Sequence, residues 1–386
     1  MRFPEFSGEW EEHTLSEYLE FKNGLNPDAK RIGSGLPFIS VMDILSEGVI
    51  NYDNIRGKVN ATEKEIECFG VKDGDLLFQR SSETLEDVGR ANVYMDNRTA
   101  IYGGFVIRGR KIGNYDPLFF KYLLATPLAR KRTCRMGAGA QHFNIGQEGL
   151  SKISLYFPSI EEQRKIAEFL SLIDERIATQ NKIIEDLKKL KSAIIEKEYT
   201  HKTKSNSHIG DFIEQTSKRN KNRAIQNVLS VSNRQGFIQQ SEQFENRSVA
   251  SDDTSSYKIV KKNNFAFNPA RINVGSIARL TTFDRGIVSP MYICFRTKDT
   301  LFPEYLDYYF ETKQFFTEIQ KRLEGSVRQC LSFEGLCNIP LCIPTIEVQQ
   351  QVGKQLSTLV QEIKLEIDFL ELLQRQKKFL LHQMFI

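Results

Sequence analysis

The sequence is short of the residues that build metal sites and disulfides: it has 6 cysteines and 5 histidines among 386 residues. No two cysteines form a Cys-x-x-Cys pair and no histidine accompanies them, so we expect reduced, packed thiols and no metal site. No run reaches the roughly 18–20 apolar residues of a membrane span, and no apolar signal segment follows Met1-Arg2-Phe3-Pro4-Glu5. We therefore exclude secretion and membrane insertion and expect a cytoplasmic protein.

Signatures of catalysis and nucleotide binding are missing as well. Gly137-Ala138-Gly139-Ala140-Gln141-His142 starts like a dinucleotide-binding fingerprint, but a histidine stands where the third glycine belongs, and no Gly-x-x-x-x-Gly-Lys-Ser/Thr loop occurs. Asn268-Pro269-Ala270-Arg271 lacks the second proline and the aromatic residue of the Asn-Pro-Pro-aromatic loop of amino-methyltransferases. Pro27-Asp28 has no acid-x-lysine triplet on a following strand to complete a nuclease metal site, because Asp186-Leu187-Lys188 is too distant and lies in a predicted coiled-coil helix. We expect no catalytic activity from this chain.

What the sequence does contain is an uneven charge distribution, although the net charge is only +4. Residues 1–100 hold 11 basic and 19 acidic side chains, residues 101–150 hold 8 and 2, and residues 201–300 hold 16 and 8. Such segregation places positive potential on particular surfaces and is typical of proteins that bind a polyanion such as nucleic acid. A solvated basic face without a ligand would give the same counts.

The chain also repeats itself once. Pro158-Ser159-Ile160-Glu161-Glu162-Gln163 recurs as Pro344-Thr345-Ile346-Glu347-Val348-Gln349, so the residue numbers differ by a constant offset of 186. Farther upstream the offset drifts to 190, where Ile39-Ser40-Val41 resembles Leu229-Ser230-Val231. The repeat predicts two half-copies, each a globular domain followed by a helix. The expected domains are residues 1–157, a central helix at 158–200, a second globular domain at 201–343 and a C-terminal helix at 344–386.

Each of the two helices carries a coiled-coil stripe, in which seam positions alternate spacings of four and three residues. In the first helix the seam consists of Ile166, Leu170, Ile173, Ile177, Gln180, Ile184, Leu187, Lys191 and Ile194. The same offset gives Val352, Leu356, Leu359, Ile363, Glu366, Leu370, Leu373, Lys377 and Leu380. The polar positions coincide, which indicates equivalent surroundings for both helices.

The simplest way to bury both seams is to pack the two helices against each other. A pseudo-two-fold relation between the halves would make the helices antiparallel; in the alternative, each seam packs only on its own globular domain. Within each domain we predict buried strands at residues 75–78 and 264–267 and helices at residues 117–124 and 304–318. The predicted fold class is mixed α/β, with two globular domains joined by two long antiparallel coiled-coil helices in a pseudo-two-fold repeat.

Polar loops follow the two predicted buried strands. Gln79-Arg80-Ser81-Ser82 follows the first, and Asn268 and Arg271 lie in the loop after the second. Gln and Asn pair with adenine edges and Arg with guanine, so these loops are candidates for base reading. The glycine-rich segments that contain Gln141 and His142, and Arg328 and Gln329, are candidates for the same role. Turns whose polar residues merely face water are the alternative.

Basic residues cluster at one place in each half. Arg130, Lys131, Arg132 and Arg135 form the densest group, and Lys218, Arg219, Lys221 and Arg223 open the second half. We interpret both groups as contacts to DNA phosphates, which position a protein without specifying a sequence. A role in solubility alone is the alternative.

Three segments resemble the conserved helices of type I restriction–modification specificity subunits, the HsdS family. They are Pro158 to Ala167, Leu172-Ile173-Asp174-Glu175-Arg176-Ile177, and Leu380-Leu381-His382-Gln383-Met384-Phe385. Together with the repeat, the resemblance covers the whole chain. The second helix departs from the pattern at Val348 and at Val360-Gln361.

The resemblance implies a non-catalytic bacterial subunit that binds double-stranded DNA with two target-recognition domains. Each domain would read one half of a bipartite, asymmetric target. The apolar seam residues would dock subunits, namely two methyltransferase (M) subunits that use S-adenosylmethionine on adenine and two restriction/translocase (R) subunits that use ATP and Mg. No cofactor would bind to this chain.

Two other functions fit the sequence. One is the recognition subunit of a solitary adenine-methylation system without a motor partner. The other is a coiled-coil assembly adaptor without DNA affinity, whose binding would depend on neither salt nor DNA sequence.

Overall fold

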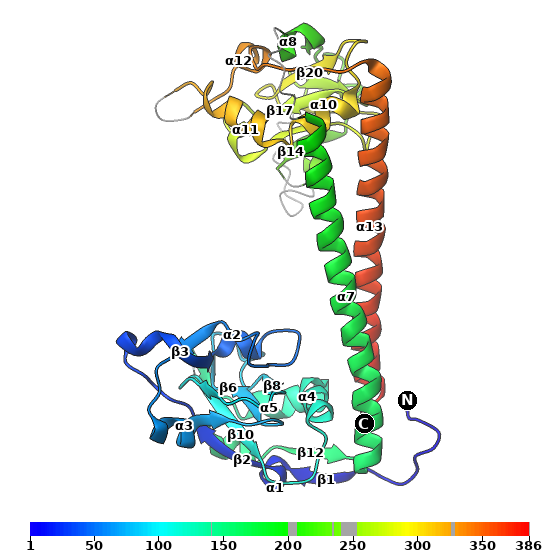
Figure 1. Ribbon diagram of the computed structural model, residues 1–386. Coiled ribbons are helices and arrows are strands. Elements are labelled where there is room, and N and C mark those ends of the chain that lie inside the picture. Colours follow the sequence, from blue (N-terminus) through cyan, green and yellow to red (C-terminus); the bar gives the residue numbers. More distant parts are fainter. Residues whose placement is uncertain (140, 200–206, 234, 241–252, 326–328, 386) are drawn as a thin grey trace. The chain divides into compact units, whose positions relative to one another are not determined.

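The computed structural model describes residues 1–139, 141–199, 207–233, 235–240, 253–325 and 329–385. The chain forms two compact units, which we describe separately (Figure 1). Unit 1 comprises Met1–Lys182 and Asp368–Ile386, and unit 2 comprises Ile183–Ile367. Each unit therefore holds one globular domain and part of each long helix.

The domain of unit 1 contains twelve of the strands that are described, together with short helices. The elements in chain order are β1 (Glu11–Thr14), α1 (Leu15–Tyr18), β2 (Leu19–Asn23), η1 (Ala29–Arg31), β3 (Ile32–Ile39), α2 (Val41–Ile44), β4 (Gly57–Val59), α3 (Glu63–Phe69), β5 (Gly70–Val71), β6 (Leu76–Gln79), β7 (Ser81–Ser82), β8 (Ala91–Val93), β9 (Ala100–Tyr102), β10 (Val106–Lys111), α4 (Pro117–Ala125), α5 (Pro127–Arg135), β11 (Phe143–Asn144), α6 (Gln147–Ser151) and β12 (Ser154–Phe157).

The domain of unit 2 repeats much of this order. Its elements are α8 (Ile209–Phe212), β13 (Ile213–Thr216), β14 (Val228–Ser232), β15 (Gly236–Gln239), β16 (Lys258–Lys261), β17 (Phe265–Phe267), η2 (Ile272–Val274), β18 (Ile277–Arg279), β19 (Arg285–Val288), β20 (Ile293–Thr297), α10 (Pro303–Tyr309), α11 (Lys313–Gln320) and α12 (Phe333–Cys337).

The four-stranded sheets of the two domains correspond strand for strand. In unit 1 the two four-stranded sheets have the orders β2-β10-β6-β8 and β4-β3-β9-β5, and in unit 2 they have the orders β13-β20-β17-β18 and β15-β14-β19-β16. In each domain one parallel pair, β3 with β9 or β14 with β19, lies among antiparallel neighbours. The internal repeat seen in the sequence is therefore a repeat of structure.

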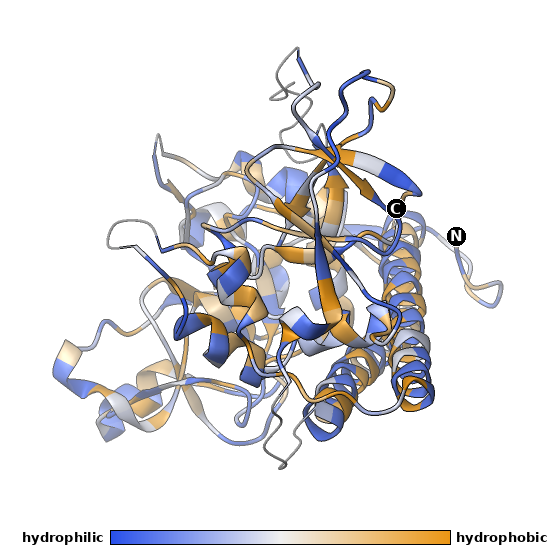
Figure 2. Cartoon of the chain, turned by 90° about the horizontal axis from the view of Figure 1, so that it is seen from above, coloured by the Kyte–Doolittle hydropathy of each residue, from blue (hydrophilic) through white to orange (hydrophobic). Residues whose placement is uncertain are grey.

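The buried strands lie where the sequence predicts them. All residues of β6 and β17 are buried, and they pack in the cores together with aromatic side chains of α4 and α10. Hydrophobic residues concentrate on the strands and helices, and the loops are mostly hydrophilic (Figure 2). The single helix predicted at residues 304–318 is wrong, because Thr312 starts a new helix: its Oγ1 accepts a hydrogen bond from the Phe315 backbone N–H at 3.1 Å.

The long helices α7 (Ile160–Tyr199) and α13 (Ile346–Gln383) each contribute to both units (Figure 1). In unit 1 the first half of α7 meets the last part of α13, where Lys377 Nζ lies 2.5 Å from Asp174 Oδ1. In unit 2 the end of α7 and the beginning of α13 share one core, which includes Ile195 and Val352. The helices thus run antiparallel within each unit, and the predicted fold class is confirmed.

Three further observations concern membrane-spanning helices, metal sites and disulfides. None of the helices in the described part of the chain is long and apolar enough to cross a membrane. Among the described residues, no three His, Cys, Asp or Glu side chains are grouped so that they could hold a metal ion. All six cysteines are free.

Candidate nucleic-acid interface

In unit 1 the strand-end loop and the glycine-rich segment lie side by side. Strand β7, which is Ser81–Ser82, pairs antiparallel with β11, and the Ile145 backbone N–H donates to the Arg80 carbonyl at 3.0 Å. On its other side, the Arg80 backbone N–H donates to the Phe105 carbonyl at 2.9 Å, and its Nη1 donates to the Gly104 carbonyl at 3.3 Å. Residues 80–82, 104–105 and 141–145 thus form one surface, which we call loop surface 1.

Unit 2 has the corresponding arrangement. The Leu331 backbone N–H donates to the Pro269 carbonyl at 3.0 Å, and Leu331 is the counterpart of Ile145 in the sequence repeat. Strand β20 pairs with β17 so that Ile293 faces Phe267, which places Met291 beside the loop that begins at Asn268. Residues 268–276, 289–292 and 329–331 form loop surface 2.

Two of the predicted base-reading side chains are turned inward. Gln79 is only 4% exposed, and its Nε2 donates to the Ser81 carbonyl at 2.9 Å, while its Oε1 has no hydrogen-bond partner in the described part of the chain. Asn268 is also buried, and its Oδ1 accepts from the Ala270 backbone N–H at 3.1 Å. Both amides shape their loops, because a buried loop backbone needs these hydrogen bonds.

The remaining candidates are accessible. Arg80, Ser81 and Ser82 are partly exposed, and Arg271 is exposed. Gln141, His142 and Gln329 are also exposed. Arg328 lies outside the described residues.

The first basic cluster, on α5, divides into two kinds of residue. Arg130 Nη2 donates to the carbonyls of Glu86 and Val88 at 2.9 and 2.6 Å. Arg132 Nη1 donates to the Ser154 carbonyl at 2.6 Å and to Glu12 Oε1 at 2.7 Å. These two guanidiniums hold the domain together, whereas Lys131 and Arg135 are exposed. The sequence could not predict that Arg130 is held in place while Lys131 is exposed, because the carbonyls that Arg130 contacts come from a loop distant in the sequence.

The second basic cluster surrounds a cavity. Lys218, Arg219 and Lys221 line a space of about 800 Å³ together with Arg285 from β19, and among the described residues no acidic side chain lines it. Arg223 lies next to it and pairs with Asp253 at 3.1 Å. A concave surface lined by four cations concentrates positive potential and suits a phosphate backbone.

Among the lining residues that sequence reasoning missed are Asn220 and Arg285. Asn220 is fully buried and folds the loop back: its Nδ2 donates to the Ile225 carbonyl at 2.8 Å, and its Oδ1 accepts from the Ile225 backbone N–H at 3.2 Å. Arg285 reaches the cavity from a strand much later in the chain. Of these two residues only Asn220 could have been noticed in the sequence, since Asn is common at tight turns.

The glutamine of the repeated motif fastens each helix to its domain. Gln163 is buried at the start of α7; its Oε1 accepts from the Asp116 backbone N–H at 3.1 Å, and its Nε2 donates to the Pro158 carbonyl at 3.0 Å. At the equivalent position of α13, Gln349 Oε1 accepts from the Phe302 backbone N–H at 2.8 Å. Asp116 and Phe302 are the residues that precede α4 and α10. The motif is therefore a junction between helix and domain.

The two seam lysines form a second junction. Lys377 Nζ pairs with Asp174 and lies 5.9 Å from the centre of the Tyr122 ring. Lys191 Nζ lies 5.6 Å from the centre of the Tyr308 ring, and Tyr308 is the counterpart of Tyr122 in the sequence repeat. Lys191 pairs with Glu311 at 2.6 Å. Each lysine thus meets an equivalent tyrosine of its domain.

The apolar seam residues are all buried or partly buried, but not all in the same way. Ile166, Leu170 and Leu380 belong to the core of unit 1, and Val352 and Leu356 belong to the core of unit 2. The ends of the seams therefore also pack on the domains, but Leu380 of α13 does so on the domain of unit 1, so the interpretation in which each seam packs only on its own domain does not hold. The apolar seam positions that are not among the buried residues of these two cores are Ile173, Ile177, Ile184, Leu187, Ile194, Leu359, Ile363, Leu370 and Leu373.

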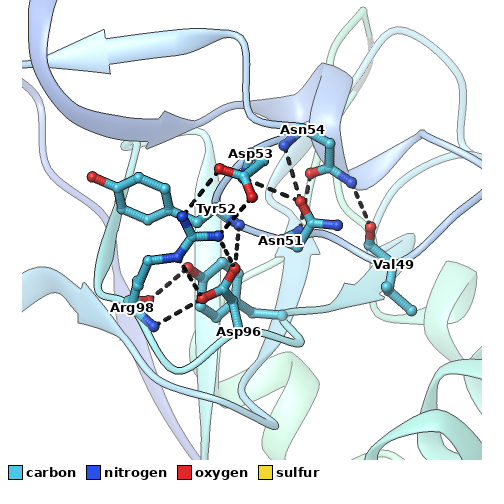
Figure 3. Close-up of polar contacts among 8 residues, drawn as sticks. Val49, Asn51, Tyr52, Asp53, Asn54, Asp96 and Arg98 are labelled. Atoms are coloured by element: carbon cyan, nitrogen blue, oxygen red, sulfur yellow. Dashed lines mark hydrogen bonds and ion pairs between the residues drawn. The ribbon is translucent and has the colours of Figure 1, made fainter.

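A charged network joins two loops on another part of unit 1 (Figure 3). Arg98 Nη2 donates to Asp53 Oδ2 at 2.7 Å and to Asp96 Oδ2 at 2.8 Å, and the guanidinium lies 4.3 Å from the centre of the Tyr52 ring. The hydrogen bonds from Arg98 hold the pKa of Asp96 far below its ordinary value. The network fixes the loops at residues 51–54 and 96–98, so its role is structural.

Comparison with known proteins gives a consistent result. A family model described as "Type I restriction modification DNA specificity domain" matches residues 7–189. The type I restriction enzyme MjaVIII specificity subunit of Methanocaldococcus jannaschii is 26% identical over 223 residues, which cover 55% of this chain and 48% of the relative. The EcoKI specificity subunit of Escherichia coli is 26% identical over 151 residues, which cover 38% of this chain and 32% of the relative. The chain thus spans half or less of the length of these relatives.

Solved structures share the fold over nearly the whole chain. A crystal structure of the S subunit of a type I restriction–modification system from M. genitalium has a TM-score of 0.58 and 15% identity, covering 98% of this chain and 96% of that chain. A chain from a structure on complex assembly of the type I R-M system has a TM-score of 0.56 and 12% identity, covering 97% of each. At this identity the likeness concerns the fold alone.

Proposed function

We propose that the chain, which belongs to the family of type I restriction–modification DNA specificity subunits, selects a bipartite DNA target. Members of this family are the non-catalytic subunits of type I restriction enzymes. Loop surface 1 reads one half of the target and loop surface 2 reads the other. We place this activity in the cytoplasm, where chromosomal DNA is accessible.

The observation that carries this proposal is the repetition of the loop surfaces. In each domain, a loop after a buried strand is hydrogen-bonded to a second polar segment, through Ile145 and Arg80 in one case and through Leu331 and Pro269 in the other. The polar side chains differ between the two surfaces, with Arg80 and His142 in the first and Arg271 and Gln329 in the second. Two similar frames with different reading residues suit an asymmetric target.

Phosphate contacts would supply most of the affinity. We propose that Lys131 and Arg135 in unit 1, and the cavity lined by Lys218, Arg219, Lys221 and Arg285 in unit 2, bind the DNA backbone. Such contacts fix the register of a protein on the duplex and leave the sequence to the base-reading loops.

We further propose that the long helices hold the partner subunits. Several large apolar side chains of the helices remain exposed, among them Leu372 and Phe379 of α13. Two methyltransferase subunits would dock on these helices and modify adenine with S-adenosylmethionine, and two restriction subunits would contribute ATP- and Mg-dependent translocation and cleavage. This chain would bind none of these cofactors.

Methylome sequencing tests the proposal directly. The chain is expressed with its methyltransferase subunit in a host that lacks the system, and the modified sites give the target. Arg80→Ala should change or relax one position in one half of the target, and Arg271→Ala should do so in the other half, because each bidentate arginine contact contributes about 1–3 kcal/mol of base discrimination.

Arg375→Ala is the matched control, because this exposed arginine lies on α13 and belongs to neither loop surface. It should leave the target unchanged. If Arg80→Ala altered both halves, or if no sequence-specific methylation appeared with the wild-type chain, the assignment of one half-site to each domain would be wrong.

A further inference from the structure

The two domains expose a large apolar side chain at the same place in the fold. Phe105 is 67% exposed and Met291 is 60% exposed, and the two residues are counterparts in the sequence repeat. They lie on loop surface 1 and loop surface 2 respectively. Neither residue drew attention in the sequence, where both follow short polar or glycine-rich stretches.

The turn that carries each side chain is also the same. In unit 1 the Val106 backbone N–H donates to the Gly103 carbonyl at 2.9 Å, and in unit 2 the Tyr292 backbone N–H donates to the Ser289 carbonyl at 3.1 Å. Phe105 and Met291 both occupy the third position of this four-residue turn. The turn leads into β10 or β20, whose partner strand ends at the candidate base-reading loop. The exposure is therefore a repeated feature of the fold.

In unit 1 the apolar surface extends beyond one residue. Phe105, Met42 and Ile32 are all exposed and line one cavity of about 400 Å³, whose other lining residues include Phe38 and Val106. Arg80 is hydrogen-bonded to the backbone of Gly104 and Phe105, so its guanidinium lies directly beside this apolar surface. Exposed apolar patches of this kind mark binding surfaces.

We propose that Phe105 and Met291 each contact the C5-methyl group of a thymine in the half-site that its own domain reads. This inference rests on the proposed function, which places both loop surfaces on DNA. The thymine methyl is the apolar group that base pairs present in the major groove, where Phe and other apolar side chains read it. The flexible thioether side chain of Met291 suits the same contact. Each domain would thus combine an arginine for guanine with an apolar residue for thymine.

Single substitution of deoxyuridine for thymidine tests the proposal, because it removes only the methyl group. Every half-site of an adenine-methylating system contains at least one A·T pair and therefore a thymine. The wild-type chain, bound to its methyltransferase subunits, should lose about fourfold in affinity for one such substitution in each half of its target, as expected for one buried methyl-sized group.

The variants assign each contact to one domain. Phe105→Ala should remove the sensitivity to deoxyuridine in one half-site only, and Met291→Ala should remove it in the other half-site only. Ile112→Ala and Phe316→Ala are matched controls, because both residues are large, apolar and exposed and neither is one of the residues that form the loop surfaces. These controls should keep the sensitivity in both half-sites. All four side chains are exposed, so the substitutions should leave folding intact.

Three results would overturn the inference. If the wild-type complex binds its target specifically but is indifferent to every deoxyuridine, the apolar residues do not read thymine, although the proposed function stands. If Phe105→Ala instead loses its methyltransferase subunit while deoxyuridine sensitivity persists, the patch is a protein contact. If the wild-type complex shows no preference for any DNA sequence, the proposed function fails together with the inference.

Discussion

Replacement of the motif glutamines by leucine would test whether they fasten the helices to the domains. Gln349→Leu keeps a side chain of similar size but removes three hydrogen bonds. They join the amide of Gln349 to the Phe302 N–H and to the carbonyls of Thr300 and Pro344, at 2.8, 3.1 and 2.9 Å. Gln163→Leu removes two such bonds, to the Asp116 N–H and the Pro158 carbonyl.

The magnitude follows from the number of backbone groups left without a partner. A buried polar group that loses its hydrogen bond costs about 1–3 kcal/mol, and leucine recovers part of this by burying apolar surface. We therefore expect Gln163→Leu to lower the free energy of unfolding by about 2–4 kcal/mol and Gln349→Leu by about 3–5 kcal/mol. Each loss should concern one unit, because Gln163 and its partners lie in unit 1 and Gln349 and its partners lie in unit 2.

Urea denaturation followed by hydrogen exchange and mass spectrometry would separate the two units. Gln163→Leu should expose amides of unit 1 at lower urea, and Gln349→Leu should do so in unit 2. Gln351→Leu is the control, because this residue of α13 is exposed and only two positions away. If Gln349→Leu proved as stable as Gln351→Leu, the repeated glutamine would not be a junction, and the repeated motif would need another explanation.

Four further predictions address DNA binding, stability, half-site spacing and pH. The affinity for DNA should fall steeply with salt. The double variant Lys218→Ala with Lys221→Ala should weaken binding to all sequences and reduce the slope of log affinity against log salt by about 2, since each phosphate contact contributes about 0.9. An unchanged slope in filter-binding titrations would show that these lysines do not contact DNA. By contrast, Arg130→Ala should destabilise unit 1, because this guanidinium bonds to two carbonyls. If the helices set the distance between half-sites, inserting four residues after Lys188 adds about 6 Å of helix and should lengthen the unread gap by one or two base pairs, with both half-sites unchanged. Methylome sequencing of this variant is the measurement, and a changed half-site with a fixed gap would refute the prediction. The folded-state pKa of Asp96 is lowered, so the stabilisation by Arg98 is fully present above the ordinary pKa of 3.8 and is lost as pH falls through the lowered pKa. The difference in Tm between the wild-type chain and Arg98→Met should therefore shrink as the pH falls below 3.8. A difference that stayed constant from neutral pH down to acid would exclude this linkage.

The sequence alone was sufficient for the features that arise from local patterns. The constant offset between the two copies of the Pro158–Gln163 motif predicted the duplicated domains, and the seam periodicity predicted two long helices, found at Ile160–Tyr199 and Ile346–Gln383. The runs around Phe78 and Phe267 predicted buried strands, because short apolar stretches between turns are typical of such strands. The family resemblance was also carried by contiguous motifs.

Only the tertiary structure decided what individual side chains do. Arg130 and Lys131 are neighbours in one basic run, yet Arg130 is held by carbonyls from residues 86–88 and Lys131 faces solvent, because the fold brings that distant loop to one side of α5. Gln79 is buried and Phe105 is exposed, against what their polarity suggests, because burial depends on which other elements pack around each position. The partners of a side chain come from segments far away in the sequence, and a local pattern holds no record of which carbonyl or which loop will arrive beside it.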